Sequence, residues 1–202
     1  MQTKTTPTRD QRDKAIAIAR DVLLQMERED NPLGVRAGVY LDGIGRVRYA
    51  FDDTDDLQVH IEAAQKHCRV CALGAMMLSA VRLYDGCPIG GLCSSRGVIE
   101  NVLRVHMSDR AMDMIEAAFE VLDICQLDET TDRDIDFAMT FGSKGGSPVD
   151  RLRRIMENVI SNDGDFDPGM GEHAVTSEEV KSWEANRDDD DDEDDDDESD
   201  DF

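Results

Sequence analysis

The sequence is poor in aromatic residues, and this shortage limits the kind of core that the protein can build. Aromatic residues make up 5% of the 202 residues, whereas apolar residues as a group make up 40%. Sheets are enriched in aromatic and β-branched residues, so a core made of Leu, Ile, Val, Ala and ten Met favours helices. The composition therefore predicts a mainly α protein with one modest core.

Basic residues are also scarce: 22 stand against 46 acidic residues, for a formal net charge of −24. Proteins that bind a nucleic-acid backbone directly need basic residues clustered on one face. The best candidates are two short groups, Arg46 with Arg48 and the run of Arg151, Arg153 and Arg154. We therefore do not expect direct nucleic-acid binding, and the charge favours a basic protein as the partner.

Long apolar runs are missing as well. None reaches the roughly 18 residues that a membrane span needs. The polar N-terminus, MQTKTTPTRDQRDK, lacks the apolar segment of a signal peptide. We expect no membrane association and a cytoplasmic location, where the five cysteines stay reduced.

Local signals predict several helices. Thr8 and Gln11 have the spacing of a capping box at the start of a helix that runs to about Arg28. Its apolar stripe consists of Ile16, Ala19, Leu23 and Met26. Ser108 is the expected N-cap of a later helix. Further helical pieces are expected at 98–105 and 135–141.

The middle of the chain has a hairpin pattern and one strongly apolar segment. Residues 39–41 and 46–51 flank Asp-Gly-Ile-Gly, which predicts one β-hairpin. Residues 57–84 are helical in character, with a break expected near Cys68. Within them, 70–83 are apolar nearly all round, which indicates a central buried helix.

The last expected helix of the body starts at Ser147, with Pro148 at its first position and Asp150 near the positive end of its dipole. Gly164 fits a left-handed cap after its end. Its expected inward side chains are Val149, Leu152, Ile155, Met156 and Val159. From Asp165 the pattern predicts a linker, with a transient helix at 177–186.

The predicted organisation is one helical domain over 10–165, with about five to six helices and one β-hairpin. Residues 1–9 are expected to be disordered and 166–187 to be a linker. Residues 188–202 are expected to form a disordered acidic tail.

Metal sites are not predicted, although two patterns come near one. Cys68-x2-Cys71 is followed by Cys87-x5-Cys93, which lacks the second closely spaced pair of a zinc site. A helix over 71–84 would also separate Cys71 from Cys87 by roughly 20 Å. We keep a zinc-stabilised domain as an alternative to buried, inert thiols.

The triplet Asp163-x-Asp165-x-Asp167 opens like a calcium-binding loop. Pro168 and Ala174 then stand where such a loop needs glycine and glutamate.

No cofactor or catalytic residue is predicted, so we expect a protein that is not an enzyme. A cysteine nucleophile needs a histidine base nearby in space. Nothing around His60, His67, His106 or His173 matches a hydrolase signature. Residues 142–146, Gly-Ser-Lys-Gly-Gly, lack the full pattern of a phosphate-binding loop.

The tail is the most distinctive part of the sequence. Residues 188–202 hold 13 acidic residues and no base, and they end in Phe202. Extended backbone places residues about 3.4 Å apart, which is also about the charge spacing along one DNA strand. The tail therefore imitates a phosphodiester strand and adds an apolar side chain and a carboxylate at its end.

The tail sequence DDDDDEDDDDESDDF, with Trp183 upstream, resembles the C-terminal tails of bacterial and phage single-stranded DNA-binding proteins. The resemblance implies a tail that recruits replication enzymes and competes with DNA for the protein's own groove. It points to Trp183, Asp200, Asp201 and Phe202 as partner-binding residues. The body departs from that family, whose domain is an aromatic-lined OB-fold barrel.

A second segment, Cys68-x-x-Cys-Ala-Leu-Gly-Ala75, resembles a motif of uncharacterised bacterial and phage proteins. It implies no known activity, but it suggests a phage origin and hence the host cytoplasm. We therefore expect a non-enzymatic, phage-type interaction protein. Its acidic tail would mimic nucleic acid or recruit a basic, nucleic-acid-processing partner. The alternative is a single-stranded DNA-binding protein with an atypical body and an autoinhibitory tail.

Overall fold

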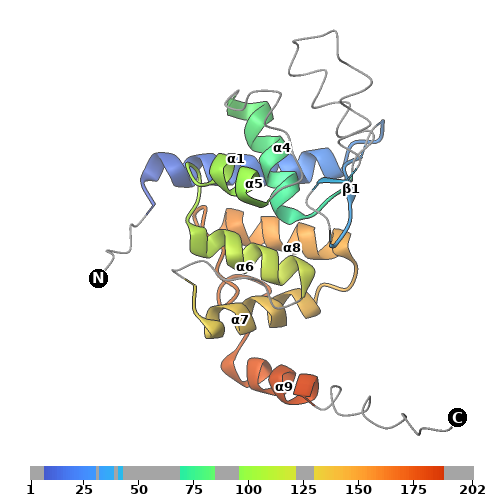
Figure 1. The fold of residues 1–202 in the computed structure, drawn as a ribbon, viewed down its shortest axis with the longest axis vertical. Helices are drawn as coiled ribbons and strands as arrows, with labels where there is room; N and C mark the ends of the chain where they lie inside the picture. The colour runs from blue at the N-terminus through green and yellow to red at the C-terminus, as the bar shows by residue number, and fades with distance from the viewer. Residues whose placement is uncertain are drawn as a thin grey trace, which may run out of the picture.

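The protein is mainly α-helical, as the composition predicted. The computed structural model describes residues 7–30, 32–38, 41–42, 69–84, 96–121 and 130–188. Over these residues the chain forms seven helices and a small sheet (Figure 1). The helices are α1 (Arg9–Met26), α4 (Ala72–Tyr84), α5 (Arg96–Leu103), α6 (Asp109–Glu120), α7 (Asp132–Ser143), α8 (Pro148–Ser161) and α9 (Ser177–Asp188). None of the helices described combines the length and apolar character needed to cross a bilayer.

The predicted helix starts are confirmed by the hydrogen bonds at each cap. At α1 the Thr8 N–H donates to Gln11 Oε1 over 2.8 Å, and the Gln11 N–H donates to Thr8 Oγ1 over 3.3 Å. Ser108 and Ser147 accept in the same way from the third residue of α6 and of α8. Each cap satisfies a backbone donor that the helix itself leaves unpaired.

α4 is the central buried helix that the apolar segment predicted. Every residue from Ala72 to Val81 is buried, and the helix contacts α1, α5 and α6. Its start differs from the prediction, because Arg69 and Val70 form strand β3 instead of continuing the helix. The helix begins only at Ala72.

The sheet joins three short strands in the order β1-β3-β2. β1 (Gly34–Val35) runs parallel to β3 (Arg69–Val70), and β2 (Leu41–Asp42) runs antiparallel to it. The second arm of the predicted hairpin, 46–51, lies outside the described residues, as do 57–68, 85–95 and 189–202.

The helices are arranged in layers. α1 packs on α4 and α8, α6 packs on α7 and α8, and α9 packs on α7. In Figure 1 the helices α1, α6, α7 and α9 follow one another down the long axis of the molecule. The core runs without interruption from Ile18 in α1 to Val180 in α9.

Three predictions about packing were wrong in whole or in part. The predicted stripe of α1 is confirmed at Ala19, which is fully buried, and at Leu23 and Met26, which pack against the core, but the buried face also includes Ala15, Ile18 and Val22. Val149 is 45% exposed, because it lies on the outer side of α8 in the first turn. The third concerns 166–187, which the sequence predicted to be a linker: Phe166, Val175 and Val180 are buried in the core.

The tightest helix contact gives a direct test of the fold. A Cβ at Gly142 in α7 would lie 1.9 Å from the carbonyl oxygen of Ala118 in α6, so backbone would have to move. We expect Gly142→Ala to lower the free energy of unfolding by about 3 kcal/mol, measured by urea titration. The matched control is Gly97→Ala in α5, where a Cβ would meet nothing within 4 Å. It should leave stability unchanged or raise it by up to ~1 kcal/mol. Equal effects of the two substitutions would contradict the α6–α7 contact.

Candidate partner-binding surface

Helix α9, which carries Trp183 and leads into the acidic tail, has a fixed start. The Thr176 N–H donates to Glu179 Oε2 over 2.8 Å, and the Glu179 N–H donates to Thr176 Oγ1 over 3.3 Å. This reciprocal pair is a capping box. Its Thr-x-x-Glu pattern is present in the sequence, but it was not among the predicted helix starts. Glu179 also forms an ion pair with Lys144 at the end of α7. Lys144 and the Thr176 N–H hold the pKa of Glu179 at about 2.

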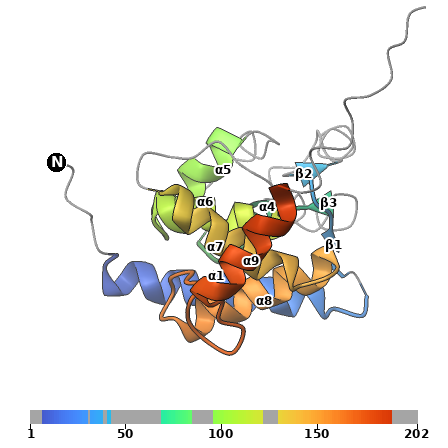
Figure 2. The same cartoon turned by 90° about the horizontal axis from the view of Figure 1, so that it is seen from below.

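The apolar side of α9 packs on the body. Val180 is 4% exposed, and Trp183 is a partly buried side chain packed against the core. Seen from below, α9 lies across α7 (Figure 2). The indole of Trp183 therefore contributes to the docking of α9, and its contact with a partner stays a prediction. Asp200, Asp201 and Phe202 lie outside the described residues.

The segment between α8 and α9 is held in place by an aromatic contact. Phe166 is fully buried, and its ring meets that of Phe141 in α7 edge to face, with the centroids 5.4 Å apart. Just before it, Gly164 adopts a φ of +85°, and a Cβ there would come within 2.6 Å of the Arg12 carbonyl oxygen. The chain therefore turns tightly against α1 before Phe166 enters the core.

Asn158 in α8 is the polar anchor of the same segment. Its Nδ2 donates to the carbonyl oxygens of Asp167 and Met170 over 2.8 and 3.0 Å, and its Oδ1 accepts from the Asp167 N–H over 2.9 Å. Asn158 is only 5% exposed. One buried side chain thus satisfies three backbone groups of a non-helical segment, which fixes its path.

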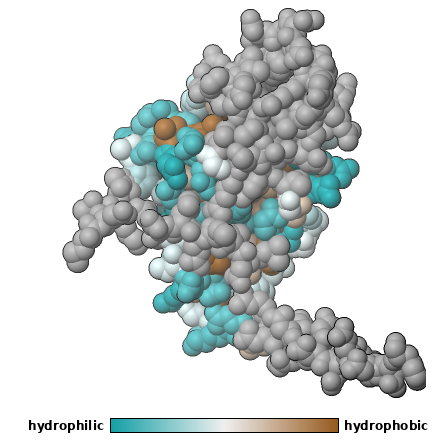
Figure 3. Space-filling view, in the orientation of Figure 1, coloured by the Kyte–Doolittle hydropathy of each residue, from teal (hydrophilic) through white to brown (hydrophobic). Residues whose placement is uncertain are grey.

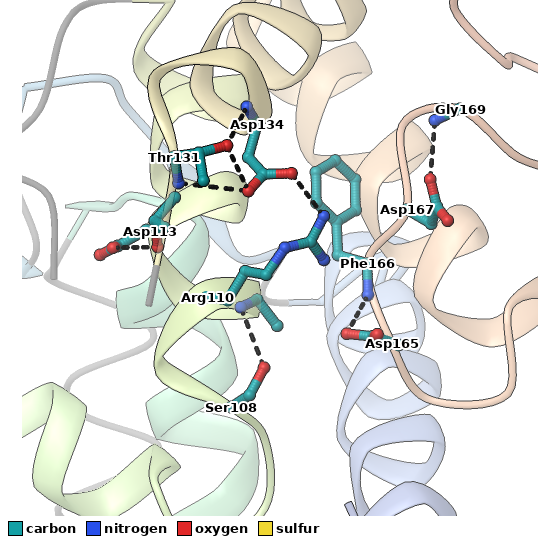
Figure 4. Close-up of polar contacts among 11 residues, drawn as sticks. Ser108, Arg110, Asp113, Thr131, Asp134, Asp165, Phe166, Asp167 and Gly169 are labelled. Carbon is teal, nitrogen blue, oxygen red and sulfur yellow. Dashed lines mark hydrogen bonds and ion pairs between the residues drawn. The ribbon is translucent and has the colours of Figure 1, made fainter. Parts of the chain in front are cut away.

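A polar cluster joins α6, α7 and this segment (Figure 4). Arg110 donates to Asp134 Oδ1 over 2.7 Å, and that bond raises the pKa of Arg110. Burial raises the pKa of Asp165, which lies on the other side of Arg110. Thr130 Oγ1 donates to the fully buried Asp113 over 2.6 Å. These contacts bind the layers to one another.

The three aspartates with calcium-loop spacing serve separate structural contacts. Asp163 pairs with Arg12 over 2.8 Å, Asp165 accepts from the Phe166 N–H, and Asp167 accepts from the Gly169 N–H. In the part of the chain that the structure describes, no three His, Cys, Asp or Glu side chains are grouped to hold a metal ion.

The arginine run on α8 divides between two faces. Arg153 pairs with Glu27 of α1 over 2.8 Å. Arg151 and Arg154 instead lie over the rings of Phe119 in α6 and Phe141 in α7, at 5.8 and 4.9 Å from the ring centroids. The run therefore does not form one basic face. Arg46 and Arg48 lie outside the described residues.

Cys71, the described cysteine, and His106, the more buried of the two described histidines, lack the features of a reactive pair. Cys71 is 2% exposed, and burial raises the pKa of its thiol to about 12, so the thiolate needed for metal binding or attack is disfavoured. Its three potential zinc partners, Cys68, Cys87 and Cys93, lie outside the described residues. His106 is 7% exposed and packs against Tyr84, with the ring centroids 5.2 Å apart and the planes tilted by 30°.

One cavity of 190 Å³ lies beside α8, lined by Glu157, Asn158, Ser161, Glu172 and His173. Sites for small organic ligands usually measure about 300–1,000 Å³, so this hollow is small for one. The described surface in Figure 3 is mostly hydrophilic. Its exposed large apolar side chains come from five separate segments: Leu24, Leu83, Val105, Val149 and Met170.

Comparisons with known proteins identify no relative. No protein-family model, no curated protein and no solved structure matches the chain.

His106 should give the protein a measurable pH dependence. Burial and the nearby Lys14 lower its pKa in the folded protein, whereas an unfolded histidine titrates near pH ~6.5. Between these two pKa values the unfolded chain binds the extra proton, so stability falls as the pH drops through that window. His106→Phe keeps a ring on Tyr84 and removes the titration. Urea unfolding between about pH 7.5 and about pH 5.5 should show a smaller loss in the variant. An equal loss would contradict this role for His106.

The docking of α9 can be tested without unfolding the body. We expect Val180→Ala with Trp183→Ala to raise the hydrogen exchange of backbone amides in α9 by at least tenfold, because the apolar contact with the core is lost. Amides in α4 and α6 should keep their protection. Ser182→Ala is the matched control, because Ser182 is exposed on the same helix. Rapid exchange of α9 in the unmodified protein would contradict the docking.

Proposed function

We propose that the protein is a non-enzymatic, phage-type interaction protein that presents its acidic tail to a basic partner. The partner is a protein with a basic groove, such as a nucleic-acid-processing enzyme, in the host cytoplasm. The tail competes for that groove as a copy of a nucleic-acid strand.

The observation that carries the proposal is the attachment of α9. Glu179, Val180 and Trp183 fix this helix on the body, and α9 ends at Asp188, the first of the 13 tail acids. A tail attached to a fixed helix starts from a defined point, whereas a tail on a loose linker samples a large volume. The body can therefore orient the tail towards a partner that it also touches.

The charge of the body supports a protein target instead of a nucleic-acid target. Residues 1–187 still hold 33 acidic and 22 basic residues. Seven described arginines have a carboxylate within 4 Å, namely Arg9, Arg12, Arg28, Arg82, Arg104, Arg110 and Arg153. Bases that are paired inside the molecule contribute little to a phosphate-binding face.

The proposal predicts capture of a basic partner through charge and through Phe202. We compare the full chain with a variant in which all 13 tail acids are changed to Asn or Gln, and with Phe202→Ala. The full chain should retain one or more nucleic-acid-binding proteins from host lysate, and an excess of single-stranded DNA should release them. The neutral tail should abolish capture, and Phe202→Ala should weaken it several-fold, because an apolar anchor is removed.

The same variants also distinguish the proposed function from the alternative, which is single-stranded DNA binding. A single-stranded DNA-binding protein would bind an oligonucleotide more tightly with the neutral tail, with a steep salt dependence. Retention of the same partners by the neutral-tail variant would overturn the proposal. Fluorescence anisotropy at low salt provides the DNA measurement, and binding by the neutral-tail variant would favour the alternative.

A further inference from the structure

Two arginines on α8 stand out because the molecule has few bases and many acids. With 46 acidic residues for 22 basic ones, a half-buried arginine should readily find a carboxylate. Arg153, between them in sequence, does so at 2.8 Å. In the described part of the chain, Arg151 and Arg154 have no carboxylate within the 4.0 Å of an ion pair.

Their hydrogen-bonding state is also unusual. The Nε atom of each is buried and has no hydrogen-bond partner among the described residues. Burial lowers the pKa of both guanidinium groups, which means that each cation has lost water without gaining an acceptor. A buried charged donor without an acceptor destabilises the folded state, unless a further group accepts its hydrogen bond.

The two side chains are placed to act together. Arg151 and Arg154 are three residues apart, so they project from the same side of α8. The rings of Phe119 and Phe141 lie beneath them and are both fully buried. Rings that are fixed in the core hold the guanidinium groups in position, and each arginine is only half-buried, so part of it remains open to solvent.

The carboxylates that act on the two arginines form no ion pair with them. Glu120 acts on Arg151 and Glu157 acts on Arg154, each from beyond ion-pair distance. Glu120 already accepts a hydrogen bond of 2.6 Å from the Gly38 N–H. The two guanidinium groups therefore lack hydrogen-bond acceptors among the described residues, and an added oxyanion can supply them.

We propose that Arg151 and Arg154 form an oxyanion-binding site, which holds a carboxylate or phosphate group from outside the folded body. Guanidinium groups bind both through paired N–H donors. The oxyanion has two possible sources, a free phosphate ion or a carboxylate of residues 189–202. The tail is long enough to reach the two arginines, because 14 extended residues can span roughly 46–50 Å. It starts from α9, which packs on α7, and α7 also supplies Phe141. The site stands independently of the partner proposed above.

The test uses the full chain and its neutral-tail variant, with inorganic phosphate as the probe. NMR signals of the arginine Nε–H groups report on the site directly. In the neutral-tail chain, phosphate should shift the Arg151 and Arg154 signals saturably. Arg151→Gln with Arg154→Gln should weaken phosphate binding at least tenfold. Arg153→Gln removes one equal charge from the same helix and should change it less than twofold.

Comparing the two chains identifies the source of the oxyanion. If the tail occupies the site, the full chain should bind phosphate several-fold more weakly, and its Arg151 and Arg154 signals should already be displaced. Equal phosphate binding by both chains supports the site with a free anion as its ligand. The proposal is overturned if phosphate shifts neither signal in either chain, or if Arg153→Gln weakens binding as much as the double variant. The first of these results is read in chains with both arginines intact, so it does not depend on the variants folding.

Discussion

The edge-to-face contact between Phe141 and Phe166 is the interaction on which the packing of α7, α8 and the segment leading to α9 depends. Phe166 brings the chain that leaves α8 back into the core, and Asn158 and Gly164 fix the turn that makes this possible. The same Phe141 lies in α7, the helix that receives α9, and its ring also supports the guanidinium group of Arg154. One buried ring therefore connects the position of the tail-bearing helix with that of Arg154, which has no carboxylate within ion-pair distance among the described residues.

Electrostatic balance is the second constraint. A chain with a net charge of −24 gains stability when its few bases lie close to acids, and the described arginines mostly do. The pairs Arg12–Asp163 and Arg153–Glu27 join α1 to α8 and its C-terminal end, far apart in sequence, and Arg110–Asp134 joins the consecutive helices α6 and α7. These pairs link the helix layers to one another, and the body keeps acidic residues in excess of its bases. An acidic body is suited to a basic protein and repels a nucleic-acid backbone.

Local sequence signals predicted the elements well and the long-range packing poorly. The caps at Thr8, Ser108 and Ser147 and the buried helix around Ala75 depend on residues close in sequence, which is why they could be recognised. The sequence predicts a linker around Phe166, because this is a single apolar residue among Asp, Gly and Pro. Its burial depends on the distant Phe141. The division of Arg151, Arg153 and Arg154 between two faces likewise depends on α1, α6 and α7, and no local pattern contains that information. The Thr176-x-x-Glu179 capping box, by contrast, is a local signal in the sequence, and it supports the prediction of a stable helix around Trp183.

The central claim is that α9 is part of the folded body, so that the tail starts from a fixed point. Trp183 is the only tryptophan, and its fluorescence reports on this docking without any substitution. We would follow urea unfolding of the full chain by tryptophan emission and by far-ultraviolet circular dichroism. The account predicts a native emission spectrum typical of a partly buried indole and a single transition with the same midpoint for both signals. A native emission already typical of indole in water, or a tryptophan transition that precedes the loss of helix, would contradict it.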